Sequence, residues 1–230
     1  MKVGVISFPG SNCDRDLIGV LDKELGLEVV SIWHKDKDLQ CCSWVFLPGG
    51  FSYGDYLRSG AIARFSPVMQ TVIDFAKGGG FVMGICNGFQ ILTESGLLPG
   101  ALLRNIHTHF VCKNVYITPD NQSSPITKGL GNKAYKIPIA HAEGNYYCDN
   151  QTLTELEVNQ QILFRYCDED GKVTPESNPN GSLGNIAGIC NKEGNVFGMM
   201  PHPERAASVF LNNSDGRRVL EGVSKIDFLP

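Results

Sequence analysis

Apolar residues in the first hundred positions follow two alternating spacings. Short continuous apolar runs, typical of strands that are buried on both faces, occupy residues 2–7, 27–33, 43–47 and 81–85. Between these runs, apolar residues recur every three or four positions, as they do in amphipathic helices, over residues 14–25 and 68–77 and again after residue 86. Strands that alternate with helices predict an α/β fold with a mostly parallel central sheet flanked by helices on both faces.

The second half of the chain has a more β-rich pattern. Short strand candidates, separated by Gly, Asn and Pro turns, lie at residues 111–117, 137–141, 162–166, 186–190 and 196–199. We expect them to add antiparallel strands, with helices following over about residues 203–211 and 215–223. The Pro- and Asn-rich stretch 168–184 is typical of a surface loop, so the chain, residues 1–230, is expected to form a single domain.

Composition narrows the class of protein. The 230 residues are 42% hydrophobic and 19% charged, which is typical of a globular protein with a sizeable core. The formal net charge of −4 is scattered, which argues against a nucleic-acid-binding face or a polybasic membrane anchor. No apolar run approaches the ~20 residues of a membrane span, and no secretory signal is visible. The eight cysteines lack C-x-x-C spacing, so we expect reduced, mostly buried thiols in a cytoplasmic protein, without a metal site.

Cys86 lies where a buried-strand pattern passes directly into a helix pattern, with Gly84 and Gly88 on either side. This layout is typical of a nucleophile elbow, with cysteine in place of serine. The glycines allow a sharp turn and keep Cβ atoms away from the reacting sulfur. The following helix directs free backbone N–H groups at that sulfur, which favours the thiolate. A chance match is the alternative, because a single G-x-C-x-G is a weak signal.

A cysteine nucleophile needs a base and a group that orients the base. Two prolines enclose His202 and restrict its backbone, and Glu204 lies two residues further on, where a carboxylate can hold the imidazole tautomer. These residues predict a Cys86–His202–Glu204 triad. His141 is a rival base, because Glu143 also follows it by two residues. Spacing alone does not separate the two histidines, although the proline frame favours His202.

Acyl transfer also needs donors for a developing oxyanion. The Asn87 N–H, directly after the nucleophile, is the first candidate. The second is the N–H of Gly50 or Phe51, in a glycine-rich turn that follows a predicted strand. Ligands of open parallel sheets bind at the carboxyl ends of strands, where this turn and Cys86 both lie. An ordinary strand-to-loop turn accounts equally well for the two glycines.

Three segments in this order carry a family resemblance: Pro48-Gly49-Gly50, residues 84–90 (GICNGFQ) and residues 201–204 (PHPE). Together they resemble class I, triad-type glutamine amidotransferases, whose fold is flavodoxin-like. The longer stretches 8–14, 50–61 and 198–205 resemble the glutaminase subunits (subunit I) of phosphoribosylformylglycinamidine synthases. The similarity covers residues 2 to about 223, and the tail after it, residues 224–230, matches nothing in the family.

The resemblance implies a mechanism. Cys86 attacks the side-chain amide of glutamine and forms a γ-glutamyl thioester, His202 acts as acid and base, and Glu204 orients His202. The family pattern also assigns Gln90 to glutamine binding, and makes His141 and Glu143 secondary site candidates that contact glutamine or the synthetase. This chain has Ala142 where the family pattern has glycine, a change that affects only local backbone freedom.

The resemblance also implies partners. The chain contains neither a P-loop nor a dinucleotide-binding glycine motif, so we expect no cofactor on it. ATP and Mg are expected on a large synthetase subunit, which, with a small accessory subunit, would use the released ammonia to convert formylglycinamide ribonucleotide into formylglycinamidine ribonucleotide in purine biosynthesis. Two alternatives are a glutaminase that serves another synthetase and a catalytically silent regulatory module on the same fold.

Overall fold

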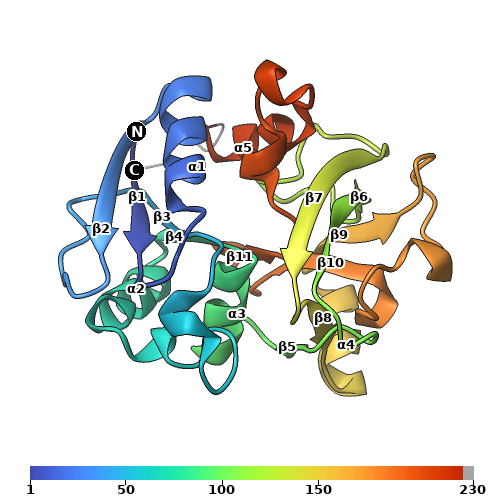
Figure 1. Cartoon of the computed structure of the whole chain (residues 1–230), viewed down its shortest axis with the longest axis horizontal. Helices are drawn as coiled ribbons and strands as arrows, with labels where there is room; N and C mark the ends of the chain where they lie inside the picture. The colour runs from blue at the N-terminus through green and yellow to red at the C-terminus, as the bar shows by residue number, and fades with distance from the viewer. Residues whose placement is uncertain (225–230) are drawn as a thin grey trace.

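A mixed sheet of nine strands, in the order β2-β1-β3-β4-β11-β10-β9-β6-β7, runs through the part of the chain that the structure describes, residues 1–224 (Figure 1). The structure is a computed structural model. Helices α1 and α5 lie on one side of the sheet, and α2 and α3 lie on the other (Figure 1). The predicted α/β fold with helices on both faces is confirmed.

Five strands run parallel to one another at predicted positions, although the strand over residues 196–199 was expected among the antiparallel strands. They are β1 (Lys2–Ser7), β2 (Glu28–Trp33), β3 (Trp44–Leu47), β4 (Phe81–Ile85) and β11 (Val196–Met199). The helices between the first four and after β4 are α1 (Asp14–Gly19), which continues as a π-helical turn (Val20–Glu24), α2 (Pro67–Lys77) and α3 (Asn87–Glu94). Strands β1, β3, β4 and β11 are buried along most of their length, which explains their continuous apolar runs. The edge strand β2 is different, because only Ile32 in it is buried.

The antiparallel strands of the second half are also confirmed. They are β6 (Val111–Pro119), β7 (Tyr135–His141), β9 (Ile162–Cys167) and β10 (Ile186–Cys190). Sequence reasoning missed a small second sheet of β5 (Ala101–Leu103) and β8 (Asn145–Tyr147), and the helix α4 (Asn150–Val158). Helix α4 buries only Leu156, so it has no apolar stripe to reveal it, although Asp149 caps it by accepting from the Thr152 N–H at 2.7 Å.

The C-terminal region departs from the expected helix over residues 203–211. The structure has two short 3₁₀ helices there, Pro203–Ala206 and Val209–Leu211. The chain leaves helical geometry at Ala207 and Ser208, which have φ values of −125° and −135°, and the Ser208 hydroxyl accepts from the Phe210 N–H. The first 3₁₀ helix is largely buried and the second is exposed, so one continuous amphipathic helix does not fit. Helix α5 (Asp215–Ser224) agrees with the prediction for residues 215–223.

Aromatic side chains fill the core around the parallel strands. The ring centroid of Trp44 on β3 lies 4.9 Å from that of Phe81 on β4 and 5.6 Å from that of Phe197 on β11. Six of the eight cysteines are buried, whereas Cys41 and Cys112 are exposed. No helix within residues 1–224 is long and apolar enough to cross a membrane. The tail after α5, residues 225–230, lies outside the described residues.

Two glycines allow helix α3 to pass close to the strands. A Cβ atom on Gly88 would lie 1.9 Å from the Leu47 carbonyl oxygen of β3, and one on Gly84 would lie 2.5 Å from the Gly88 carbonyl carbon. Neither glycine has a positive φ; the residue that does is Cys86 itself, at φ 50°. We expected Gly84 and Gly88 to permit the sharp turn. In the structure they instead permit the close packing of helix α3 on the sheet.

We expect Gly88→Ala to lower the free energy of unfolding by roughly 1–3 kcal/mol or more, because rigid backbone surrounds the added methyl group. Urea unfolding monitored by circular dichroism measures the change. Gly19→Ala is the matched control: a Cβ there meets nothing within 4 Å, so the variant should gain up to about 1 kcal/mol. Equal effects of the two substitutions would contradict the packing argument.

Candidate active site

Three adjacent parallel strands bring the predicted site residues together. Strands β3, β4 and β11 are neighbours in the sheet and run in the same direction. The Gly49–Gly50 turn follows β3, Cys86 follows β4, and His202 lies shortly after β11. Segments far apart in sequence therefore meet at one edge of the sheet, as expected for the carboxyl ends of parallel strands.

Cys86 occupies a sharp turn between β4 and α3. Its φ and ψ of 50° and −105° are unusual for a residue with a side chain, and strain of this kind is typical of functional positions. Its N–H donates to the Met199 carbonyl of β11 at 2.8 Å, which anchors the turn to the neighbouring strand. The side chain is only 4% exposed, and its sulfur lies 3.7 Å from the Ala140 carbonyl oxygen. The turn thus has the shape of a nucleophile elbow.

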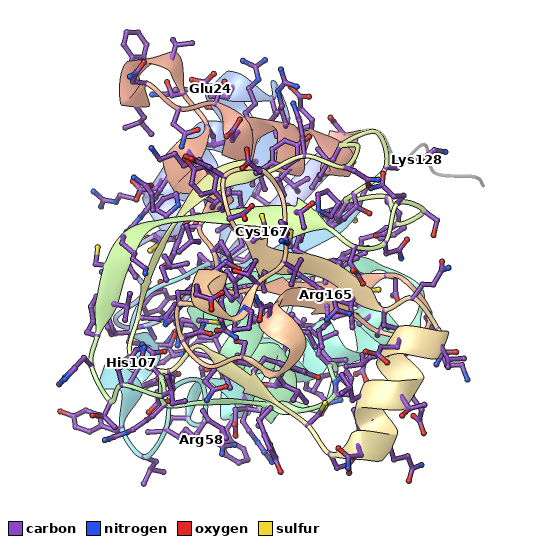
Figure 2. The ribbon with its side chains drawn as sticks, turned by 90° about the vertical axis from the view of Figure 1, so that its right-hand side faces the viewer. Glu24, Arg58, His107, Lys128, Arg165 and Cys167 are labelled. Atoms are coloured by element: carbon purple, nitrogen blue, oxygen red, sulfur yellow. The ribbon has the colours of Figure 1, made fainter. Side chains whose placement is uncertain are left out.

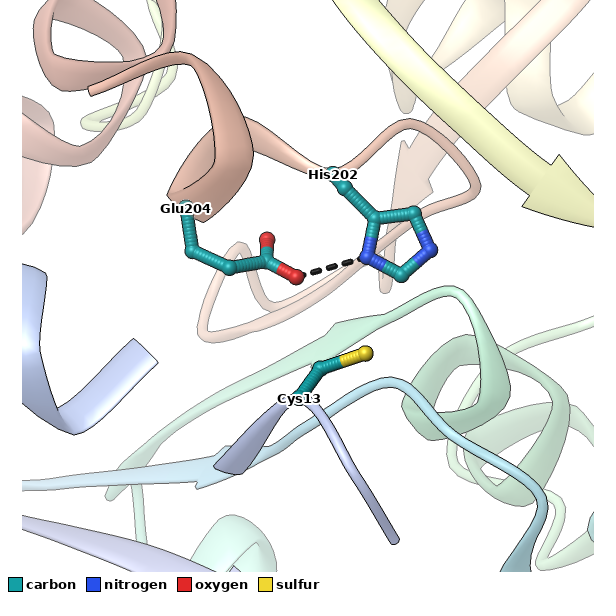
Figure 3. A group of neighbouring side chains, drawn as sticks. All are labelled: Cys13, His202 and Glu204. Carbon is teal, nitrogen blue, oxygen red and sulfur yellow. Dashed lines mark hydrogen bonds and ion pairs between the residues drawn. The ribbon is translucent and has the colours of Figure 1, made fainter. Parts of the chain in front are cut away.

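His202 and Glu204 form a buried hydrogen-bonded pair (Figure 3). His202 Nδ1 lies 2.6 Å from Glu204 Oε1, and the His202 N–H donates to the Pro138 carbonyl at 2.8 Å. Burial by itself lowers the pKa of His202, but the Glu204 carboxylate and the Cys86 sulfur outweigh burial and hold the pKa well above its ordinary value. Cys86 and His202 follow neighbouring strands, and His202 Nε2 has no hydrogen-bond partner among residues 1–224, so this nitrogen is free for a proton or a ligand.

Cys13 is a neighbour of this pair that sequence reasoning missed. Its sulfur, an imidazole nitrogen of His202 and a carboxylate oxygen of Glu204 lie within 4.8 Å of one another (Figure 3). These are ligand types that bind Zn²⁺. Here, however, Arg205 Nη2 donates to the Cys13 sulfur at 3.0 Å, so a cation already contacts this group. The arrangement favours a hydrogen-bond network behind the imidazole over a metal site.

The glycine turn after β3 fits closely against His202. A Cβ on Gly49 would lie 2.5 Å from His202 Cε1, so a larger residue would displace the imidazole. Of the two predicted oxyanion donors in this turn, the Phe51 N–H already donates to the Gly10 carbonyl at 3.0 Å. The Gly50 N–H has no partner within residues 1–224. The Asn87 N–H opens helix α3 and lacks an intrahelical acceptor. Gly50 and Asn87 are therefore the donors that this conformation offers.

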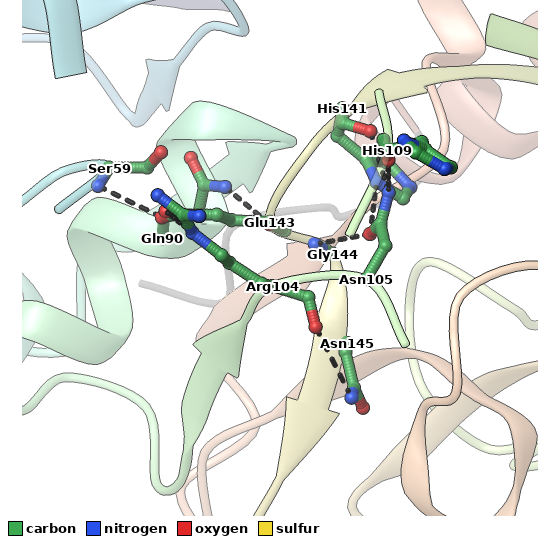
Figure 4. A network of polar contacts seen from close by, with 9 residues as sticks. All are labelled: Ser59, Gln90, Arg104, Asn105, His109, His141, Glu143, Gly144 and Asn145. Atoms are coloured by element: carbon green, nitrogen blue, oxygen red, sulfur yellow. Dashed lines mark hydrogen bonds and ion pairs between the residues drawn. The ribbon is translucent and has the colours of Figure 1, made fainter. Parts of the chain in front are cut away.

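A small cavity of about 120 Å³ lies beside Cys86. Six of the predicted site residues contribute to its wall: Gly50, Phe51, Cys86, Gln90, His141 and Glu143. Asp55 and Ser59 line it too, and sequence reasoning assigned neither a role, although both lie within the 50–61 stretch that carries the family resemblance. Gln90 Nε2 donates to the Glu143 carbonyl at 2.5 Å, which joins helix α3 to the loop after β7 (Figure 4).

His141 has a different environment from His202. Its Nδ1 donates to Asn105 Oδ1 at 3.0 Å, and the same oxygen accepts from the Gly144 N–H (Figure 4). Burial, reinforced by the nearby His202, lowers the pKa of His141 to about 4, so the imidazole is neutral at physiological pH. Asn105 also bonds the His141 and Ala142 backbone, which fixes this loop. Of the two histidines, only His202 has a carboxylate partner among residues 1–224, so the geometry favours it as the base.

Asp55 carries a perturbed carboxyl group. Burial raises its pKa to about 6, and the neighbouring Glu143 carboxylate adds to the increase, while hydrogen bonds from Ser59 and Asn87 oppose it. Asp55 also has a positive φ of 53°, as do Tyr53 and Leu57 in the same loop. The loop thus holds a carboxylate in the cavity against both solvation and backbone preference, which is typical of a functional position.

The perturbed Asp55 gives a pH-dependent stability. Between about pH 4 and pH 6 the folded protein retains a proton that the unfolded chain releases, so this stabilisation is present below about pH 4 and is lost as the pH rises through about 6. In Asp55→Asn this side chain cannot ionise, so the variant does not lose this stability as the pH rises. We expect the variant to be more stable than wild type by roughly 1–2 kcal/mol at about pH 8 and nearly equal at about pH 4. Urea unfolding at both pH values measures this, and a difference that does not change with pH would refute it.

The His202–Glu204 pair gives a second prediction. In Glu204→Gln the carboxylate charge is gone and burial of the imidazole dominates, so the pKa of His202 should fall below its ordinary value. NMR titration of the His202 ring measures the shift. Glu176→Gln, at an exposed position, is the control and should leave it unchanged. A His202 pKa that stays high in Glu204→Gln would show that Glu204 does not control the imidazole.

The fold and the arrangement of these residues correspond to the class of glutamine amidotransferases. A family model described as the CobB/CobQ-like glutamine amidotransferase domain matches residues 1–225. A glutamine amidotransferase structure from Thermotoga maritima matches 99% of this chain and 86% of its own length with a TM-score of 0.57. At 15% sequence identity, that likeness concerns the fold alone.

Relatives of higher identity narrow the class. The phosphoribosylformylglycinamidine synthase subunit PurQ of Moorella thermoacetica is 58% identical over 97% of this chain and 95% of its own length. The same subunit of Thermosynechococcus vestitus is 56% identical, over 97% and 93%. A chain in the PurLQS structure from Thermotoga maritima is 39% identical, covers 97% of both chains and has a TM-score of 0.83. The chain therefore belongs to the PurQ family of glutamine amidotransferases.

Proposed function

We propose that this chain is the glutaminase subunit of a phosphoribosylformylglycinamidine synthase. It would hydrolyse glutamine through a thioester on Cys86 and supply ammonia for the ATP-dependent conversion of formylglycinamide ribonucleotide to formylglycinamidine ribonucleotide in purine biosynthesis. The observation that supports the proposal is that the Cys86 elbow and the buried His202–Glu204 pair follow two adjacent parallel strands, β4 and β11. The PurQ relatives support the choice of reaction.

The site geometry supports a stepwise mechanism. The Cys86 sulfur attacks the amide carbon of glutamine, and the charge that develops on the oxygen is stabilised by the N–H groups of Gly50 and Asn87. His202 gives its proton to the departing ammonia and then takes one from the water that hydrolyses the thioester. Glu204 holds the imidazole through Nδ1, which leaves Nε2 as the nitrogen that exchanges protons.

We assign glutamine binding to the cavity beside Cys86. Gln90 is fixed on both sides: its Oε1 accepts from Asn87 Nδ2 at 2.9 Å, and its Nε2 donates to the Glu143 carbonyl. Through these bonds Gln90 aligns the wall that glutamine would contact. We assign His141 and Glu143 to the same wall, with His141 in a supporting role because Asn105 occupies its Nδ1.

The released ammonia needs an acceptor site on another polypeptide. The partners proposed for this chain are a large synthetase subunit, which would bind ATP and Mg, and a small accessory subunit. The matched chain from the PurLQS structure and the subunit names of the relatives support these partners. We assign no cofactor to this chain itself and place it, as a single domain of residues 1–230, in the cytoplasm.

The alternatives differ in their chemistry and their partner. A regulatory module without catalysis would have no use for a buried His–Glu pair next to a strained cysteine, and the intact pair argues against it. A glutaminase for another synthetase would share the chemistry and differ in the partner, which a pull-down with the synthetase subunit of the same organism distinguishes.

The test is ammonia release from glutamine, with and without the synthetase and accessory subunits. We expect low release by the chain alone, a clear increase in the complex, and a loss on the order of 10³-fold or more in Cys86→Ser because the thiolate nucleophile is gone. Cys41→Ser, at an exposed cysteine, is the control and should retain activity. Persistent ammonia release in Cys86→Ser would remove the assignment, and full release by the isolated chain would contradict the dependence on partners.

A further inference from the structure

We propose that Asp55, assisted by Glu143 and Ser59, forms the subsite that binds the α-ammonium group of glutamine. Asp55 would then determine that the enzyme accepts an amino acid amide and discriminates against an amide without the α-amino group. This inference rests on the proposed glutaminase function and adds a residue that selects the substrate.

The charges around the cavity are unbalanced. Asp55 and Glu143 both line it, and no Lys or Arg occurs among the described residues of its wall. Two arginines from neighbouring loops are already engaged or exposed: Arg58 pairs with Glu94, and Arg104, whose side chain is 78% exposed, reaches Glu143 Oε1 only at 3.9 Å. Asp55 has no ion-pair partner within residues 1–224. A small cavity with two carboxylates therefore lacks the positive charge that a ligand ammonium would bring.

The acceptor character extends beyond the two carboxylates. His141 lines the same cavity, and its Nε2 is buried without a hydrogen-bond partner among residues 1–224. Because Nδ1 carries the hydrogen that Asn105 accepts, Nε2 is an acceptor. A wall of acceptors complements a ligand rich in donors. Glutamine has two such groups, the side-chain NH₂ and the α-ammonium, and attack by Cys86 fixes the amide end beside the sulfur.

The carboxylates are held in place before any ligand binds. Asn87, which is fully buried next to the nucleophile, donates through Nδ2 to Asp55 Oδ1 at 3.3 Å, while its Oδ1 accepts from the Ser52 N–H at 3.1 Å. The Ser59 N–H donates to Glu143 Oε2 at 3.1 Å (Figure 4). One loop, residues 52–59, therefore positions both acids, and Asn87 links Asp55 to the residue that reacts.

Size and distance along the ligand fit this assignment. A cavity of about 120 Å³ admits only a small molecule, so a ligand whose amide lies at Cys86 must have its other end close to the remaining polar wall. In glutamine that end carries the α-ammonium and the α-carboxylate, and of these two groups only the ammonium complements Asp55 and Glu143. In the empty site Asp55 and Glu143 repel each other. A bound ammonium would offset this repulsion, and that gain would favour binding of glutamine.

The experiment compares two substrates in the complete synthetase complex: L-glutamine and glutaramate, which is glutamine without its α-amino group. We expect Asp55→Asn to lower kcat/KM for glutamine roughly 30- to 100-fold, chiefly through KM, and to change kcat/KM for glutaramate by less than about threefold. Glu143→Gln should have the same signature with a smaller effect, because Arg104 already lies near this acid. Asp170→Asn, at an exposed turn, should change neither value.

The outcomes separate this inference from the proposed function. An equal loss for both substrates in Asp55→Asn would mean that Asp55 supports the loop or the chemistry, and would overturn the subsite. An unchanged kcat/KM for glutamine would overturn it as well. Failure of the wild-type complex to release ammonia from either substrate would instead refute the glutaminase function. Retained alkylation of Cys86 in Asp55→Asn establishes that the variant has folded.

Discussion

The register of three parallel strands is the constraint on which the site depends. Leu47 pairs with Gly84 across β3 and β4, and Ile85 pairs with Met199 across β4 and β11. These pairs fix where each strand ends, and therefore where the glycine turn, Cys86 and His202 emerge. A change of one residue in either register would invert side chains and separate the sulfur from the imidazole. The close passage of helix α3 over Gly84 and Gly88 holds the same alignment from the face of the sheet.

The buried His202–Glu204 pair lowers the stability of the fold, and we explain its presence by function. Removing an imidazole and a carboxylate from water is unfavourable unless each satisfies the other, and one short hydrogen bond does so here. His202 Nε2 and Glu204 Oε2 still lack partners among residues 1–224. Such unsatisfied atoms are rare in a core that has only to be stable. The free Nε2 is explained if this position is reserved for proton exchange with Cys86 and the substrate.

The sequence predicted those parts of the molecule that depend on local pattern. Apolar runs identified the central strands, and strand ends identified Cys86 and the glycine turn. Helix α4 was not predicted because it lacks an apolar stripe, and the break between the two 3₁₀ helices because it depends on the backbone at Ala207 and Ser208. The perturbed environment of Asp55 depends on a positive φ and on contacts with distant segments. Cys13 is an example: its position beside His202 follows from packing against Gly49 and contact with Arg205, a residue 192 positions away. No periodicity encodes such a contact.

The site combines two sets of groups with different tasks. Strand ends and the start of α3 supply the reacting sulfur, the imidazole and the free N–H groups, and these elements are rigid because the core packs against them. Loops supply the groups that select the ligand: residues 52–59, the segment around Asn105, and residues 141–144.

The loops are tied to one another through Ser59–Glu143 and Asn105–Gly144, and the rings of Phe51 and Phe110 lie 6.3 Å apart at their outer side. Arg58 and His107, from two of these loops, project toward the same end of the molecule (Figure 2). These loops also carry exposed apolar side chains, among them Tyr56, Leu57 and Phe110. Because Ser52 and Asp55 are both hydrogen-bonded to Asn87, directly after the nucleophile, the acceptor wall and the catalytic groups are held in one alignment.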